Sequence, residues 1–165
     1  MNDDIKDIEA WFSRGNHLRE TGRSRDAIFC YQKVIDIKPD TPEALYNIGH
    51  TLKKSGHNHE ALIYYQKALK INPELAEAYN GIGNIFLEEQ KWKDALLYYK
   101  KAINISPEDA KFYYNMGSAL VKQEKFQEGL NSFKQALRIN PDLSPARWSY
   151  LLSLPMIYKK EDGQV

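Results

Sequence analysis

Few residues of this sequence have the type and spacing that chemistry requires, and each candidate group is incomplete. His57 and His59 flank Asn58, but no third metal ligand accompanies them. His59 and Glu60 begin like a zinc-protease helix, yet Ile63 stands where the second histidine must be. The sequence also contains no Gly-Lys-Ser/Thr phosphate-binding loop. We therefore predict no catalytic residues, no metal site and no cofactor.

A glycine-rich segment and the single cysteine have structural explanations. Gly81-Ile82-Gly83 falls inside a predicted helix, where a dinucleotide-binding loop cannot form. Cys30 has no second cysteine with which to form an intramolecular disulfide, and we expect it to be a packed thiol on a helix. The N-terminus is acidic, unlike a secretory signal. Together these features predict a cytoplasmic protein that is not an enzyme.

Charge and composition exclude several classes of partner. The 165 residues include 23 basic and 22 acidic side chains, so the net charge of +1 creates no strong field for nucleic acid or an anionic membrane. The 42% of hydrophobic residues is enough to form a core, which argues against a wholly disordered chain. The apolar stretch 148–158 is too short for a spanning helix, which needs about 20 residues. We predict neither nucleic-acid binding nor membrane insertion.

Glycine, proline, alanine and aromatic residues recur every 34 positions, which indicates tandem structural repeats. The recurring residues are Gly15, Gly49, Gly83 and Gly117; Pro39, Pro73, Pro107 and Pro141; Ala27, Ala61, Ala95 and Gly129; and Tyr31, Tyr65, Tyr99 and Phe133. We expect an N-terminal extension at 1–7, repeats at 8–41, 42–75, 76–109 and 110–143, a closing helix at 144–158 and a tail at 159–165.

Each repeat is predicted to be a pair of helices. In the second repeat, Thr41 as N-cap and Pro42 at the first helical position mark a helix start, and Ser55-Gly56 marks the turn to the next helix. The repeated glycine inside each first helix costs about 1 kcal/mol relative to alanine. We expect it to permit close approach of the partner helix, with the aromatic row filling the space beside it.

This pattern resembles the tetratricopeptide repeat family, in which a large residue, an apolar residue beside glycine, an alanine, an aromatic residue and a proline hold fixed positions. The large position holds Trp11, Leu45, Tyr79 and Tyr113. The resemblance implies an all-α fold, a right-handed α-solenoid of helix-turn-helix repeats with a C-terminal closing helix. Two departures are Arg14, where the other repeats are apolar, and Gly129, where they have alanine. We therefore expect the first repeat to be more polar at its core-facing edge and the fourth to be looser.

The resemblance also implies that the first helices line a concave groove used in protein–protein interaction. Helical spacing leaves amide and aromatic side chains on the face that adjoins the packed one. The predicted groove residues are Phe12, Asn16, Tyr46, Asn47, His50, Asn80, Asn84, Lys111, Tyr114 and Asn115. Amides bond a peptide backbone without requiring charge, and tyrosine rings offer rigid apolar area, so we predict binding of an extended segment of another protein. The alternative is that these are merely solvated polar side chains.

Some members of the family bind the acidic C-termini of heat-shock chaperones through lysine, arginine and asparagine side chains. The corresponding positions here are Phe12, Asn16, Asn47, Glu77 and Gly81, of which only the asparagines fit. Glutamate recurs at the position of Glu77 in three repeats and would repel a carboxylate. Chaperone binding is therefore disfavoured.

The predicted closing helix is unusually apolar, and Leu151 replaces the repeated glycine. The candidate patch consists of Trp148, Leu151, Leu152, Met156 and Ile157. It predicts either self-association into a homo-oligomer or docking on a further domain. The segment 154–158 resembles the end of arrays that precede the catalytic domain in bacterial protein O-glycosyltransferase-like enzymes. Under that resemblance, the groove would select protein substrates for a larger enzyme.

Overall fold

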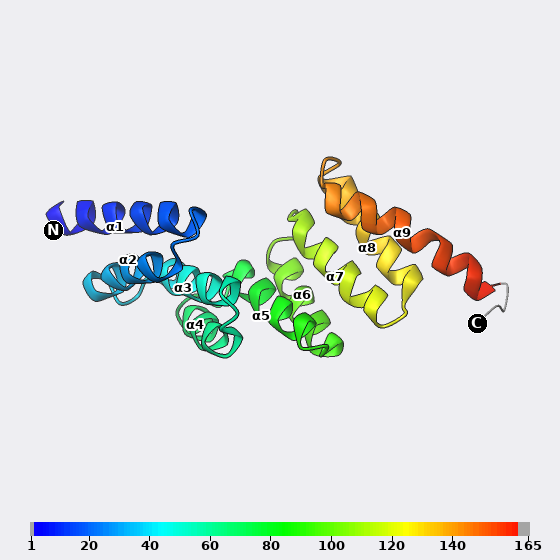
Figure 1. The fold of residues 1–165 in the computed structure, drawn as a ribbon, viewed down its shortest axis with the longest axis horizontal. Helices are drawn as coiled ribbons and strands as arrows, with labels where there is room; N and C mark the ends of the chain where they lie inside the picture. The colour runs from blue at the N-terminus through cyan, green and yellow to red at the C-terminus, as the bar shows by residue number, and fades with distance from the viewer. Residues whose placement is uncertain (1, 162–165) are drawn as a thin grey trace. The chain divides into compact units, whose positions relative to one another are not determined.

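The computed structural model describes the backbone of residues 2–161 and the side chains of residues 5–156. Within this part of the chain, nine α-helices follow one another and no strand is present (Figure 1). The helices are α1 (Asn2–Glu20), α2 (Ser24–Ile37), α3 (Pro42–Lys54), α4 (Asn58–Ile71), α5 (Ala76–Glu88), α6 (Trp92–Ile105), α7 (Ala110–Lys122), α8 (Phe126–Ile139) and α9 (Ser144–Glu161). The predicted all-α class and the helix-turn-helix repeats are confirmed. The repeat boundaries stay a prediction, and α1 already begins ahead of residue 8.

The chain divides into two compact units, residues 1–81 and 82–165, with the division inside α5. In the first unit, α1 packs on α2 and α3 packs on α4, while α2 also contacts α3 (Figure 1). Tyr31, Ile48 and Tyr65 are among its most deeply buried side chains. Burying one apolar stripe of each helix in this way is what stabilises helices too short to persist alone.

The second unit is built in the same manner around the later helices. α7 packs on α8 and also contacts α6, and α9 lies against α8 with a smaller contact to α7 (Figure 1). Tyr99, Phe133 and Ala136 are buried here.

Cys30, in the first unit, is buried as expected, and burial raises the pKa of its thiol.

The second repeat begins and turns at the predicted residues, but its capping differs from the prediction. α3 starts at Pro42, yet the Thr41 hydroxyl donates to the Lys38 carbonyl oxygen at 2.8 Å and does not cap the helix. Gly56 has φ +83° in the turn to α4, a conformation that glycine adopts without strain. The turn is therefore specified by Gly56, and the start by Pro42.

The repeated glycine makes room for an aromatic ring of the following helix. A Cβ built on Gly83 would lie 2.6 Å from Tyr99 Cε1, and one on Gly15 would lie 2.7 Å from Tyr31 Cε1. These separations are about 1 Å shorter than an ordinary carbon–carbon contact. The tyrosine row therefore does more than fill space beside the glycines, because its rings are themselves the close contact.

The two departures from the repeat pattern have local explanations. Arg14 is exposed, with its guanidinium 5.7 Å from the centre of the Trp11 ring, so its charge lies at the surface and not at the core-facing edge that the sequence predicted. A Cβ on Gly129 would lie 2.7 Å from Val121 Cγ2. The missing methyl of Gly129 thus leaves space that Val121 fills, which is a physical reason for glycine where the other repeats have alanine.

Candidate functional site

Two half-buried aromatic rings mark the first helices of the first unit. Phe12 on α1 packs edge-on against Tyr31, with 5.7 Å between ring centres. Tyr46 on α3 packs against Tyr65 at 5.8 Å. Each ring thus rests on a fully buried aromatic residue of the second helix while retaining an exposed part. This support fixes the orientation of both rings without a ligand.

Asn16 and Asn84, two predicted groove residues, hold structural hydrogen bonds. The buried Tyr31 hydroxyl donates to Asn16 Oδ1 at 2.8 Å, and the Tyr99 hydroxyl donates to Asn84 Oδ1 at the same distance. Because a buried hydroxyl needs a partner, these bonds contribute to the packing of each hairpin. Both asparagines are half-buried, so each also reaches the surface.

The sequence contains a signal for these bonds that our prediction missed. Asparagine stands 15 residues before tyrosine in the first and third repeats. In the fourth repeat, Phe133 lacks the hydroxyl, and Ser118 replaces the asparagine. The Ser118 hydroxyl instead donates to the Tyr114 carbonyl oxygen at 3.0 Å. In these three repeats the amide is thus present where a tyrosine hydroxyl needs an acceptor and absent where it does not.

Asn47 differs from what the sequence predicts. Its side chain is only 8% exposed within the first unit, so it offers little surface to a peptide. Asn80, by contrast, is half-buried on α5 in the same unit. Asn80 therefore keeps an exposed part, whereas packing of α3 covers Asn47, and the role of Asn80 in a groove stays a prediction.

His50 on α3 is half-buried and lies beside Tyr46, with ring centres 6.0 Å apart. Burial, together with the positive charges of Arg19, Lys54 and Lys53, lowers the pKa of His50 to about 4. The imidazole is therefore neutral near pH 7. Its Nδ1 is buried and has no hydrogen-bond partner among the described residues.

Tyr114 is the corresponding ring of the second unit. It packs on Phe133 with 5.9 Å between ring centres and is half-buried, as is Asn115 beside it. Lys111, one turn earlier on α7, is exposed. Three predicted residues thus lie on one helix. The Tyr114 ring packs on a buried aromatic residue of the second helix, as the corresponding rings do in the first unit.

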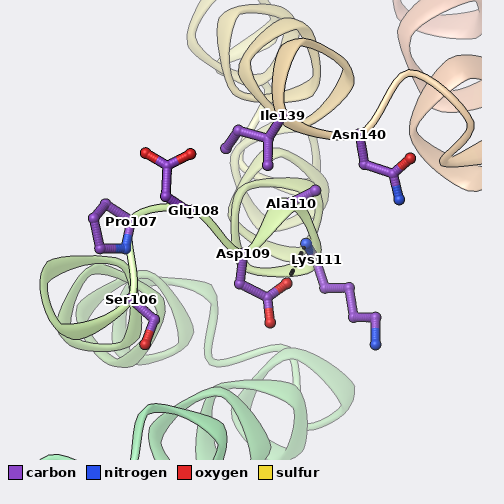
Figure 2. A pocket seen from close by; sticks show the side chains of 8 residues that line it. All are labelled: Ser106, Pro107, Glu108, Asp109, Ala110, Lys111, Ile139 and Asn140. Atoms are coloured by element: carbon purple, nitrogen blue, oxygen red, sulfur yellow. Dashed lines mark hydrogen bonds between the residues drawn. The ribbon is translucent and has the colours of Figure 1, made fainter.

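Lys111 also lines a hollow of about 700 Å³ at the junction of α6 and α7. Figure 2 shows Asp109 turned toward the backbone nitrogen of Lys111, while the Lys111 ammonium group points away from it. The Asp109 carboxylate accepts a hydrogen bond from the Lys111 backbone N–H at 2.8 Å. The start of α7 is therefore already capped by its own carboxylate.

Four large apolar residues of α9 are exposed. Trp148 is 66% exposed, Leu151 49%, Leu152 70% and Met156 43%. Four of the five residues of the predicted patch thus meet solvent in the second unit. The side chain of Ile157 lies outside the described residues.

Metal-ligand clusters and membrane-spanning helices are both absent from the described part of the chain. The described residues contain no group of three or more His, Cys, Asp or Glu side chains arranged to hold a metal ion. Among these same residues, no helix combines the length and the apolar character needed to cross a membrane.

Stacked helical hairpins with a glycine–aromatic contact between paired helices define a helical-repeat protein of the protein-interaction class. The sequence matches the model "TPR repeat" at residues 15–56 and 83–124, and the model "Tetratricopeptide repeat" at 42–75 and 110–143. The chain belongs to the tetratricopeptide repeat family. Membership supports a role as a scaffold for protein interaction.

Solved structures with this fold cover most of the chain. MamA 41-end from Desulfovibrio magneticus RS-1 is 19% identical with a TM-score of 0.72, covering 94% of this chain and 94% of that one. Pseudomonas aeruginosa pilF is 18% identical with a TM-score of 0.84, covering 97% and 72%. YrrB, described as a TPR protein with an unusual peptide-binding site, is 23% identical with a TM-score of 0.70, covering 86% and 73%. At these identities the likeness shows the fold alone. No curated protein sequence matches the chain.

Proposed function

We propose that the chain is a non-enzymatic scaffold whose first helices bind an extended peptide segment of another protein. The observation that carries this proposal is the set of half-exposed rings Phe12, Tyr46 and Tyr114, each fixed on a buried aromatic residue. Rigid aromatic rings bind with little loss of side-chain entropy, which makes them suitable anchors. The peptide-binding site of YrrB, which shares this fold, supports the proposal by analogy.

Amide and imidazole groups on the first helices supply polar contacts without net charge. Asn80 and Asn115 are half-buried near the surface, and the low pKa of His50 keeps its imidazole neutral. A peptide backbone presents alternating donors and acceptors, which neutral amides satisfy in either direction. We therefore propose a partner segment recognised by its backbone and apolar side chains. The cytoplasmic location stays a prediction.

A library of random linear peptides displayed on phage tests this function. We expect selected peptides to bind the protein, and the double variant Tyr114→Ala, Asn115→Ala to weaken binding at least about tenfold, as for truncation of an anchor residue. Phe29→Ala is the matched control, because Phe29 is an exposed ring on the second helix α2. It should bind within about twofold of the wild type, a change below that of an anchor residue.

Circular dichroism should show that the double variant stays folded. Recovery of no binding peptide, or equal affinity for the double variant and the wild type, would contradict the proposal. Asn47 is omitted from the variant because its burial would confuse lost binding with lost stability.

The exposed apolar side chains of α9 favour a second candidate function. In this alternative the repeats are the substrate-recognition array of a larger protein O-glycosyltransferase-like enzyme, and α9 docks on the neighbouring domain. An uninterrupted reading frame beyond codon 165 that encodes a catalytic domain would support it. A stop codon at that point would contradict it.

A further inference from the structure

The exposed face of α9 corresponds to a face that is covered in the preceding repeat. Trp148 and Leu151 stand 34 positions after Tyr114 and Gly117 of α7. In α7 both positions face the second helix α8. The Tyr114 ring packs 5.9 Å from the Phe133 ring, and a Cβ on Gly117 would lie 2.6 Å from Phe133 Cε1. No described helix covers the equivalent face of α9, although α9 packs on α8 and α7 through its other side.

Leu151 determines how close a covering helix can come. At the equivalent position even a single Cβ would overlap the aromatic ring of a regular second helix. A leucine side chain therefore excludes the tight glycine–aromatic packing of the repeats. It fits instead the ordinary separation of two helices with leucine at their contact, about 8–10 Å between axes. A helix packed on this face would thus not have the close geometry of the second helix of a regular repeat.

The spacing of the exposed side chains is symmetric about one residue. Trp148 and Met156 lie four positions before and after Leu152, so all three share one face of the helix. When two copies of α9 run antiparallel around Leu152, the Trp148 ring meets Met156 of the second copy, and the reverse contact forms as well. A flexible methionine beside a large ring is a favourable contact. The face is therefore complementary to itself.

Charge and hydrogen bonding also favour a second copy of α9 on this face. No charged residue occurs in 148–156, so two copies meet without repulsion, and a charged partner would find no complement there. Ser153, next to Leu152 in the sequence, is buried away from the exposed face, and its hydroxyl donates to the Ser149 carbonyl oxygen at 2.7 Å. The guanidinium of Arg147, just before the row, donates to the Pro141 carbonyl oxygen at 2.6 Å. Its charge is thereby held at the start of the helix.

We propose that α9 is a self-association surface through which two copies of the chain form an antiparallel, two-fold symmetric helix pair centred on Leu152. Such an interface is isologous, because the same patch is used by both copies. One helix face buries less than the roughly 800 Å² per partner of a standard stable interface, so the dimer is expected to dissociate on dilution. The proposal is independent of peptide binding by the first helices.

Sedimentation equilibrium of the full chain over a concentration series tests the proposal. The weight-average mass of the wild type should rise from 19.2 kDa toward twice that value as concentration increases. Leu152→Arg and Leu152→Glu should each remain at the mass of one chain, because two like charges would meet at the symmetry axis. Leu97→Arg is the matched control, since Leu97 is 52% exposed on α6, and it should associate like the wild type.

Mixing the two charged variants distinguishes pairing about Leu152 from arrangements in which the two Leu152 side chains do not face each other. An equimolar mixture of Leu152→Arg and Leu152→Glu should recover the dimer, because opposite charges would then face each other at the axis. A wild type that stays monomeric at all concentrations would overturn the proposal. A wild-type dimer that Leu152→Arg leaves intact, or a mixture that stays monomeric, would overturn the two-fold pairing about Leu152.

Discussion

Replacing Gly83 with alanine should destabilise the protein, although alanine is the better helix former. Helix propensity alone predicts that the substitution raises the free energy of unfolding by about 1 kcal/mol. Against this, the new Cβ would lie 2.6 Å from Tyr99 Cε1 and 2.8 Å from Tyr99 Cδ1. Overpacking of a core costs about 1–3 kcal/mol. The sign of the effect therefore depends on whether the Tyr99 ring can move.

The structure fixes the Tyr99 ring in two ways. The side chain is 0% exposed, and its hydroxyl donates to Asn84 Oδ1 at 2.8 Å. Movement of about 1 Å away from the new methyl would disturb both the core packing and this hydrogen bond. We therefore take the upper part of the overpacking range and expect a net loss of about 2 kcal/mol in the free energy of unfolding.

Urea denaturation followed by far-UV circular dichroism measures this loss. Asn104→Ala is the control, because Asn104 is exposed on α6 and reports helix propensity without a clash. In a Tyr99→Leu background the ring atoms are absent, so Gly83→Ala should become neutral or stabilising. A neutral or stabilising effect of Gly83→Ala in the wild type, or no change of sign in the Tyr99→Leu background, would refute the reasoning.

Three other predictions concern single residues. Tyr99→Phe leaves Asn84 Oδ1 without its donor and should lower the free energy of unfolding in urea by about 1 kcal/mol; no loss would mean that water replaces the bond. Gln90 has φ 60° at the turn position where Gly56 has φ +83°, so Gln90→Gly should raise thermal stability by about 0.5–1 kcal/mol; a lower melting temperature would contradict this. The pKa of His50 is lowered from 6.5 to about 4 in the folded protein, so below pH 6.5 the unfolded chain binds the proton more readily than the folded one. The free energy of unfolding is therefore unaffected by His50 above pH 6.5 and decreases as pH falls toward 4. After allowance for partial exposure, we expect a loss of about 1–2 kcal/mol between pH 7 and pH 4 that His50→Gln removes, measured by urea denaturation at both pH values.

Much of the fold could be predicted from the sequence because a 34-residue period leaves few alternatives. Glycine and proline positions predicted helices that begin near Pro42 and turn at Gly56, and both are observed. The aromatic row was predicted to be internal, and Tyr31 and Phe133 are buried. Local chain chemistry decides the helix starts and turns, and the repeat pattern marks the aromatic row, so these features are visible without tertiary contacts.

The candidate site was less predictable, because exposure depends on how neighbouring helices pack. Helical spacing placed Asn47 and Asn80 on the same kind of face, yet Asn47 is 8% exposed and Asn80 is half-buried. Spacing also predicted only a groove position for Asn16. In the structure, its side-chain oxygen also accepts a hydrogen bond from the Tyr31 hydroxyl. A helical pattern tells on which side of its own helix a residue lies. It does not tell how deeply a neighbouring helix buries that side.

The sequence by itself determined that this chain is a series of helical hairpins with glycines and an aromatic row between paired helices, and that α9 has more apolar residues than one buried face requires. Only the tertiary structure decided which amides hold the hairpins together, which rings keep an exposed part, and which side of α9 meets solvent. The physical reason is that the 34-residue repeat of residue types reflects packing between helices that follow one another in the chain, and this packing can be inferred from the order of the residues. Burial, hydrogen-bond partners and pKa values arise from groups that distant segments bring together.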